Sequence, residues 1–170
     1  MNIFYLSHDP VECARWHVDK HVIKMVLEYA QLLSTAHRVA NSKVANQVYK
    51  QTHVNHPSAV WTRDSRANYA WLYRLFVACN DEYAYRYGKW HGSYIQLGNI
   101  LAYNPYRDRK PFTQPTPAMD EAYKVPGDSI ASYQNYYRKA KAPLHVWSKR
   151  DPPPWILKES AGSSGPSKDV

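Results

Sequence analysis

The stretch RWHVDKHVIKMVLE, residues 15–28, gathers imidazole, ammonium and carboxylate side chains within one predicted helix. A helix advances by about 100° per residue, and most of the circumference here is apolar, which is typical of a buried helix. The polar stripe should therefore lie inside the protein or at a cleft, where it could perform acid/base chemistry. Its members are His17, His21, Lys24, Glu28 and Thr35.

Two interpretations of this stripe remain open. Lys24 and Glu28 are four residues apart and can form a structural salt bridge, and His21 can be a hydrogen-bonded core histidine. Alternatively, Glu28, Lys24 and His21 are catalytic, because a half-buried lysine or carboxylate readily changes its proton affinity. A lysine whose pKa is lowered by such burial can form a Schiff base.

A metal site is the weaker interpretation. His17 and His21 have the i, i+4 spacing that can place two imidazoles on one ion. The glutamate that lies between the histidines in zinc proteases is absent, and Lys24 would add a positive charge beside the cation. A third ligand could come from His53 or His56, but no spacing fixes it. We therefore expect no metal and no cofactor.

The composition favours a nucleic-acid partner. The 170 residues include 22 Lys and Arg against 14 Asp and Glu, a net charge of +8, together with 15 Tyr and 6 Trp. Cations neutralise phosphates and aromatic rings stack on bases. The alternative is a basic protein with a tyrosine-rich core. The preferred partner is DNA, in duplex form.

Further nucleic-acid contacts are expected from basic and aromatic positions along the chain. The segments RYGKWH and HVWSKRDPPPW combine both types, although their tryptophans could equally pack in the core. The candidate contacts are Arg15, His17, Lys20, His56, Arg63, Lys89, Trp90, Lys149 and Arg150.

The pattern predicts a mainly α fold, a single compact helical domain with a short N-terminal extended arm and long Pro-rich loops. Asp9 can cap a helix, Pro10 fits its first position, and Gly88 suits a C-terminal cap. Residues 1–158 are assigned to the domain and residues 159–170 to a disordered tail. The predicted helices span residues 10–39, 57–87 with a possible bend at 64–65, 90–102 and 128–141.

Several classes of protein are disfavoured. There is no apolar run of the roughly 20 residues that a membrane span needs, and no leader peptide. The chain has no Gly-rich phosphate loop, Ser nucleophile elbow or Cys–His signature. Cys13 and Cys79 are expected to be reduced core thiols. The protein is expected to be a cytoplasmic monomer without a membrane partner.

The arrangement resembles the pyrimidine-dimer DNA glycosylase and abasic-site lyase family of T-even phages and their microbial relatives. The similarity covers roughly residues 1–90: a short arm, a long helix with basic residues and one glutamate, then an NHP element that enters a second helix. The quoted run is YKQTHVNHPSAVWTRDSRANYAWLYRLFVACNDEYAYRYG. The pattern DP…HVDKHVIKM…E…LLSTAH is also similar to phage proteins of unknown role.

The resemblance implies a specific mechanism. A terminal α-amine attacks the sugar of a damaged nucleotide and forms a Schiff base, while a helix glutamate stabilises the sugar cation and assists elimination. Glu28 matches that carboxylate. The candidate phosphate or sugar contacts on this helix are Arg15, His17, His21 and Lys24.

The chain departs from the family at the nucleophile. The family exposes its amine by removing Met1 before a small residue, whereas Asn2 should leave Met1 in place. The amine of Met1, Lys24 or Lys20 could then serve, or the scaffold could perform different chemistry. The alternatives are another phage DNA base-modifying enzyme, such as a transferase, and a non-enzymatic nucleic-acid-binding protein.

Overall fold

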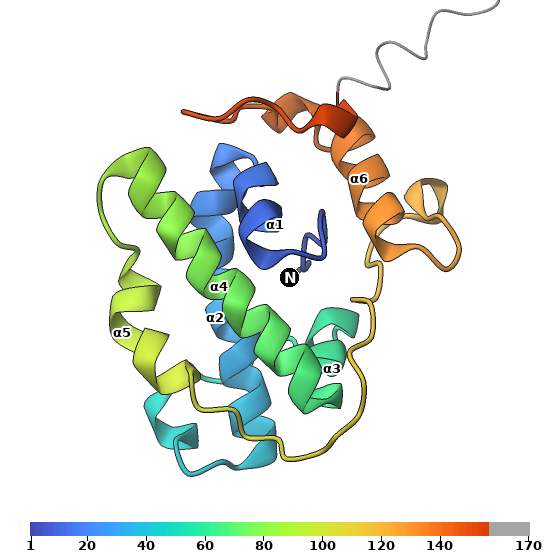
Figure 1. Ribbon diagram of the computed structural model, residues 1–170. Helices are drawn as coiled ribbons and strands as arrows, with labels where there is room; N and C mark the ends of the chain where they lie inside the picture. Colours follow the sequence, from blue (N-terminus) through green and yellow to red (C-terminus); the bar gives the residue numbers. More distant parts are fainter. Residues whose placement is uncertain (157–170) are drawn as a thin grey trace, which may run out of the picture.

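Proline and small polar caps set the starts of the helices. In the computed structural model, which describes residues 1–156 (Figure 1), the Asp9 side chain accepts a hydrogen bond from the backbone of α1 (Pro10–Trp16). Ser65 ends α3 (Pro57–Asp64) and caps α4 (Arg66–Tyr87), which confirms the predicted bend.

The remaining helices also follow the predicted pattern. Gly88 adopts a left-handed φ of 74° at the end of α4, as its predicted capping role requires. Asp128 caps α6 at the start predicted for this helix, and the mainly α prediction is confirmed. The other bounds are α2 (Asp19–Ala40), α5 (Gly92–Leu101), α6 (Ser129–Lys139) and the 3-10 turns Ala45–Gln47, Glu121–Tyr123 and Ala142–Leu144.

Between α5 and α6 the chain is largely irregular, as its prolines predicted, with one 3-10 turn and an isolated bridge. Among residues 1–156, no helix combines the length and apolarity that a membrane crossing requires. The predicted tail, residues 159–170, lies outside the described part of the chain. Cys13 and Cys79 are buried free thiols, as expected.

The prediction of one helix over residues 10–39 is wrong. His17 and Val18 are extended, with ψ angles of 134° and 156°, and separate α1 from α2. The break has a tertiary cause that lies far along the chain. Arg86 on α4 donates hydrogen bonds to the carbonyl oxygens of Arg15 and His17, both 2.9 Å away. Those carbonyls would otherwise be unpaired at the end of α1.

The core forms where α2 packs against α3, α4 and α5, while α1 packs against α4 and the N-terminal arm lies beside α1 (Figure 1). The predicted extended arm is confirmed, because residues 1–7 form no regular element and residues 3–7 are buried. Its polar backbone groups find partners on separate helices. The Phe4 amide donates to the hydroxyl of Tyr29 on α2, and Gln134 of α6 donates to the Leu6 carbonyl.

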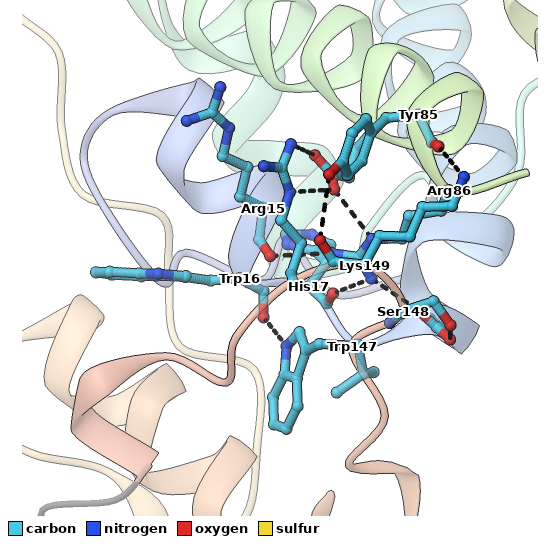
Figure 2. A network of polar contacts seen from close by, with 12 residues as sticks. Arg15, Trp16, His17, Tyr85, Arg86, Trp147, Ser148 and Lys149 are labelled. Atoms are coloured by element: carbon cyan, nitrogen blue, oxygen red, sulfur yellow. Dashed lines mark hydrogen bonds and ion pairs between the residues drawn. The ribbon is translucent and has the colours of Figure 1, made fainter. Parts of the chain in front are cut away.

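A buried ionic network fastens the C-terminal segment to the helices (Figure 2). The fully buried Arg86 donates to Glu82 at 3.0 Å and to Asp19 at 2.9 Å. Arg150 also pairs with Glu82, and the Ser148 amide donates to Asp19. Burial alone would raise the pKa of Glu82, but hydrogen bonds from Arg150 and Arg86 hold that pKa below its usual value.

Replacing Arg86 by Met should reduce the free energy of unfolding by about 3–5 kcal/mol, because Glu82 and Asp19 would lose a buried partner. Urea unfolding at pH 7 measures this loss. Lys110→Met is the matched control, since Lys110 is exposed and lies 4.0 Å from Asp64, and it should cost under about 1 kcal/mol. Equal losses in the two variants would contradict the structural importance of the network.

Candidate active site

The α-amino group of the chain lies beside a carboxylate of α2. The nitrogen of Met1 is 3.5 Å from Glu28 Oε1, and Lys24 Nζ is 3.7 Å from Glu28 Oε2. The exposed fraction is 4% for the Met1 side chain, 13% for Glu28 and 67% for Lys24. Both amines reach this carboxylate, the α-amine beside a buried Met1 side chain and the Lys24 amine at the end of a largely exposed one.

The arm holds residue 1 in this position. Ile3 and Leu6 are fully buried, and the Phe4 amide is hydrogen bonded to Tyr29, the residue that follows Glu28 on α2. Because Phe4 is fixed beside this turn of α2, the three residues before it can reach only a short distance. The amine is placed by the same packing that buries the arm.

Two oxygen atoms at this site accept no hydrogen bond within residues 1–156. They are Glu28 Oε2 and Asn2 Oδ1, and each atom is shielded from solvent. A buried acceptor without a donor costs roughly 1–3 kcal/mol, and the Lys24 ammonium 3.7 Å away partly offsets this cost at Glu28 Oε2. Similar atoms occur at Ser34 and Asn80, so they do not by themselves mark a site.

The NHP element brings a histidine to the same region. His56 Nδ1 accepts a hydrogen bond from the Ser58 amide at 3.0 Å and caps α3. The proton of the neutral ring is thereby assigned to Nε2, which becomes a donor. Burial lowers the pKa of His56, and the positive charge of the Met1 amine lowers it further. His56 is therefore a neutral donor close enough to the amine to sense its charge.

The loop before α3 is anchored to both neighbouring helices. Thr35 Oγ1, two turns beyond Glu28 on α2, bonds with the backbone carbonyl and amide of Thr52 at 3.3 and 3.2 Å. Arg63 on α3 donates to the Val54 carbonyl at 2.7 Å. His53, within this loop, has a φ of 50°, which is uncommon for a residue other than glycine. Such strained residues cluster at functional sites.

His17, predicted to contact nucleic acid, lies in the core with both ring nitrogens already bonded within the protein. It is fully buried, its Nδ1 bonds with the Cys13 carbonyl at 2.7 Å, and its Nε2 bonds with the Tyr29 hydroxyl at 2.8 Å. The error arose because the break after α1 removes His17 from the stripe on α2.

His21 is also a core residue. Its Nδ1 lies 2.6 Å from the Tyr137 hydroxyl, and its ring stacks on Phe4 with centroids 4.1 Å apart. This position corresponds to the structural alternative rather than to the catalytic role. Within residues 1–156, no group of histidine, cysteine or acidic side chains is arranged to hold a metal ion.

The other candidate contacts fall into two groups. Lys149 Nζ donates to the Tyr85 carbonyl at 3.1 Å, and Arg150 pairs with Glu82 while its guanidinium lies 4.1 Å from the Tyr85 ring centroid. Their cations are thus engaged within the protein, as is that of the half-buried Arg63. The exposed candidates are Arg15, Lys20, Lys89 and Trp90.

Sequence reasoning identified Glu28, Lys24, Met1 and His56 as candidates, and the structure brings these four together. Sequence reasoning did not single out the buried Asn2 oxygen, and it considered His53 only as a metal ligand. Asn2 carries no local signal, because its burial depends on the path of the arm.

Comparisons of the chain with protein-family models, curated proteins and solved structures give no match.

Three core histidines should make the protein acid-sensitive. Burial lowers the pKa of His17 and of His37 to about 4 and that of His21 to about 2, whereas an unfolded histidine titrates near 6.5. Below about pH 6.5 the unfolded chain therefore binds protons that the folded protein does not. The free energy of unfolding should fall by about 1.4 kcal/mol per pH unit for each histidine as the pH drops towards 4.

Urea unfolding between pH 6.5 and 4 checks this dependence. His21→Gln should reduce the slope of the free energy of unfolding against pH by the contribution of one histidine. This holds whatever the substitution does to the absolute stability. Ile95→Ala, which changes an exposed side chain without a titrating group, should leave the slope unchanged. An identical slope in His21→Gln and the unaltered protein would show that His21 takes up its proton in the folded state.

Proposed function

We propose that this protein is a DNA N-glycosylase with abasic-site lyase activity, in which the α-amine of Met1 is the nucleophile and Glu28 the assisting carboxylate. One observation carries the proposal: the Met1 nitrogen lies 3.5 Å from Oε1 of Glu28, a side chain that is only 13% exposed. The family resemblance over residues 1–90 implied an amine and an assisting carboxylate, but the sequence did not show where the amine lies.

The α-amine suits this chemistry better than a lysine. As a class, α-amino groups lose their proton near pH 8, about two units below lysine ammonium groups. A larger fraction is therefore nucleophilic at neutral pH. Lys24 is mostly exposed and lies on the outer side of Glu28. Its charge is better placed to bind a phosphate that flanks the target nucleotide.

The proposed reaction begins at C1′ of the deoxyribose. The amine lone pair forms a bond to C1′, the bond to the base breaks, and its electrons leave with the base, which takes up a proton. The sugar ring then opens, its oxygen receives a proton from the amine nitrogen, and a C1′ iminium remains. Loss of a C2′ proton and β-elimination break the C3′–oxygen bond and release the 3′ phosphate. Water finally hydrolyses the imine.

Glu28 and His56 have complementary roles in this scheme. The Glu28 carboxylate stabilises the positive charge that develops at C1′ and can then accept the C2′ proton. The neutral His56 has a donor at Nε2, which can stabilise the oxygen of the opening ring. A nucleotide must leave the base stack to reach these groups. The net charge of +8 supports attraction to the DNA phosphates.

Borohydride should trap a covalent adduct between the protein and a duplex that contains an abasic site, because it reduces the iminium to a stable amine. Mass spectrometry of the digested adduct should place the sugar remnant on residue 1. Lys24→Arg and Lys20→Arg should still give the adduct, whereas an uncleaved N-terminal extension should abolish it. An adduct on either lysine would reassign the nucleophile, and no adduct would contradict the lyase.

Glu28→Gln should slow strand cleavage at abasic sites by about 10²–10⁴-fold, because the amide cannot accept the C2′ proton. Single-turnover assays with excess protein measure the rate. Glu121→Gln is the matched control, since Glu121 lies on an exposed 3-10 turn and pairs with Lys124. Unchanged cleavage in Glu28→Gln would contradict the assigned role. A strand that stays intact but changes in base mass would indicate a transferase.

A further inference from the structure

We infer that the exposed face of α2 and the neighbouring Trp90 form the surface that receives a distorted DNA duplex, with the Trp90 ring stacking on a base beside the unstacked nucleotide. This inference rests on the proposed function, because it assigns the DNA around the Met1–Glu28 pair. The Trp90 surface comprises Lys20, Ile23, Lys24, Leu27, Lys89 and Trp90.

The α2 part of the Trp90 surface is one continuous face. Lys20, Ile23, Lys24 and Leu27 have the i, i+3, i+4, i+7 spacing that aligns side chains on a helix. All four are exposed, including the apolar Ile23 at 44% and Leu27 at 40%. Lys24 belongs to this face and also pairs with Glu28. The face therefore borders the candidate active site directly.

Trp90 lies at the other edge of the Trp90 surface, and hydrogen bonds of the next residue hold its backbone in place. The neighbouring His91 donates from Nε2 to the Ile23 carbonyl at 3.0 Å and from its amide to Asn80 Oδ1 at 2.9 Å. Its Nδ1 also accepts a hydrogen bond from Ser93 and caps α5. The position of Trp90 is thus fixed relative to α2, and binding a ligand costs little conformational entropy.

The Trp90 ring itself is open to solvent. It is 61% exposed, the most exposed aromatic side chain within residues 1–156, and meets Tyr94 edge-on at a centroid distance of 5.6 Å. An edge-on neighbour supports the ring and leaves much of its surface uncovered. A large aromatic group in water is unfavourable, so its rigid display suits a partner that presents flat apolar faces, as nucleobases do.

The charges of the Trp90 surface favour a polyanion. Lys20 and Lys89 form no ion pair within residues 1–156. The nearby carboxylate of Asp19 is neutralised by Arg86 and by bonds from Ser148. Unpaired lysines beside an exposed ring match the phosphates and bases of DNA. Because the active site must take a nucleotide out of the stack, a base next to the resulting gap becomes available to Trp90.

Binding to a duplex with a central tetrahydrofuran residue tests this inference without chemistry, since that abasic analogue cannot form an imine. Trp90→Ala in the full chain should weaken binding by about tenfold, because a stacked base is lost. Trp90→Phe, which keeps an aromatic face, should stay within about threefold of the unaltered protein. A 2-aminopurine placed next to the tetrahydrofuran should change fluorescence on binding, and Trp90→Ala should abolish that change.

Two controls separate the surface from general effects. Val39→Ala removes an exposed apolar side chain at the far end of α2 and should bind normally. Lys20→Ala and Lys89→Ala should each lower the slope of log affinity against log salt concentration by about the amount expected for one phosphate contact. The inference is overturned if Trp90→Ala binds DNA normally, or if Val39→Ala loses as much affinity. It is also overturned if Trp90→Ala keeps its affinity for DNA but no longer binds phosphatidylglycerol vesicles.

The outcomes also separate this inference from the proposed function. If borohydride traps no adduct but Trp90→Ala still weakens binding and removes the fluorescence change, the surface stands and the lyase fails. If the adduct forms on residue 1 and Trp90→Ala behaves as the unaltered protein, the lyase stands and this surface is rejected.

Discussion

Burial of the N-terminal arm is the constraint on which the candidate site depends. Residues 3–7 lie in the core, and the Phe4 amide is tied to Tyr29, immediately after Glu28. Apolar burial drives this arrangement, while hydrogen bonds to separate helices satisfy the backbone of a segment that has no secondary structure. The chain's own amine consequently lies beside Glu28, and a terminus that is mobile in many proteins is held in place.

The Arg86 network has a comparable role for the other end of the described chain. It occupies the carbonyls at the break between α1 and α2 and neutralises carboxylates that secure residues 148–150 (Figure 2). Such a network is tolerated in the core because its charges and hydrogen bonds are largely satisfied. It also explains why basic residues near the C-terminus, although expected at a nucleic-acid surface, are partly used to hold the protein together.

Particular residues show how far sequence reasoning reached. Caps at Asp9, Ser65 and Asp128 are local signals, and each helix starts as they predicted. The helical wheel correctly grouped Glu28 with Lys24, because the two share one unbroken helix. It failed for His17, since no local residue marks the end of α1 and the partner that stabilises this end lies on α4.

The sequence by itself determined the helical class, most helix boundaries and the choice of Glu28, because caps, prolines and apolar periodicity act over a few residues. Only the tertiary structure decided that the α-amine reaches Glu28 in addition to Lys24, and which cations face solvent. It also decided that His17 and His21 belong to the core, where Tyr29 and Tyr137 are their partners. These outcomes depend on contacts between residues distant in the chain, and no local pattern encodes them.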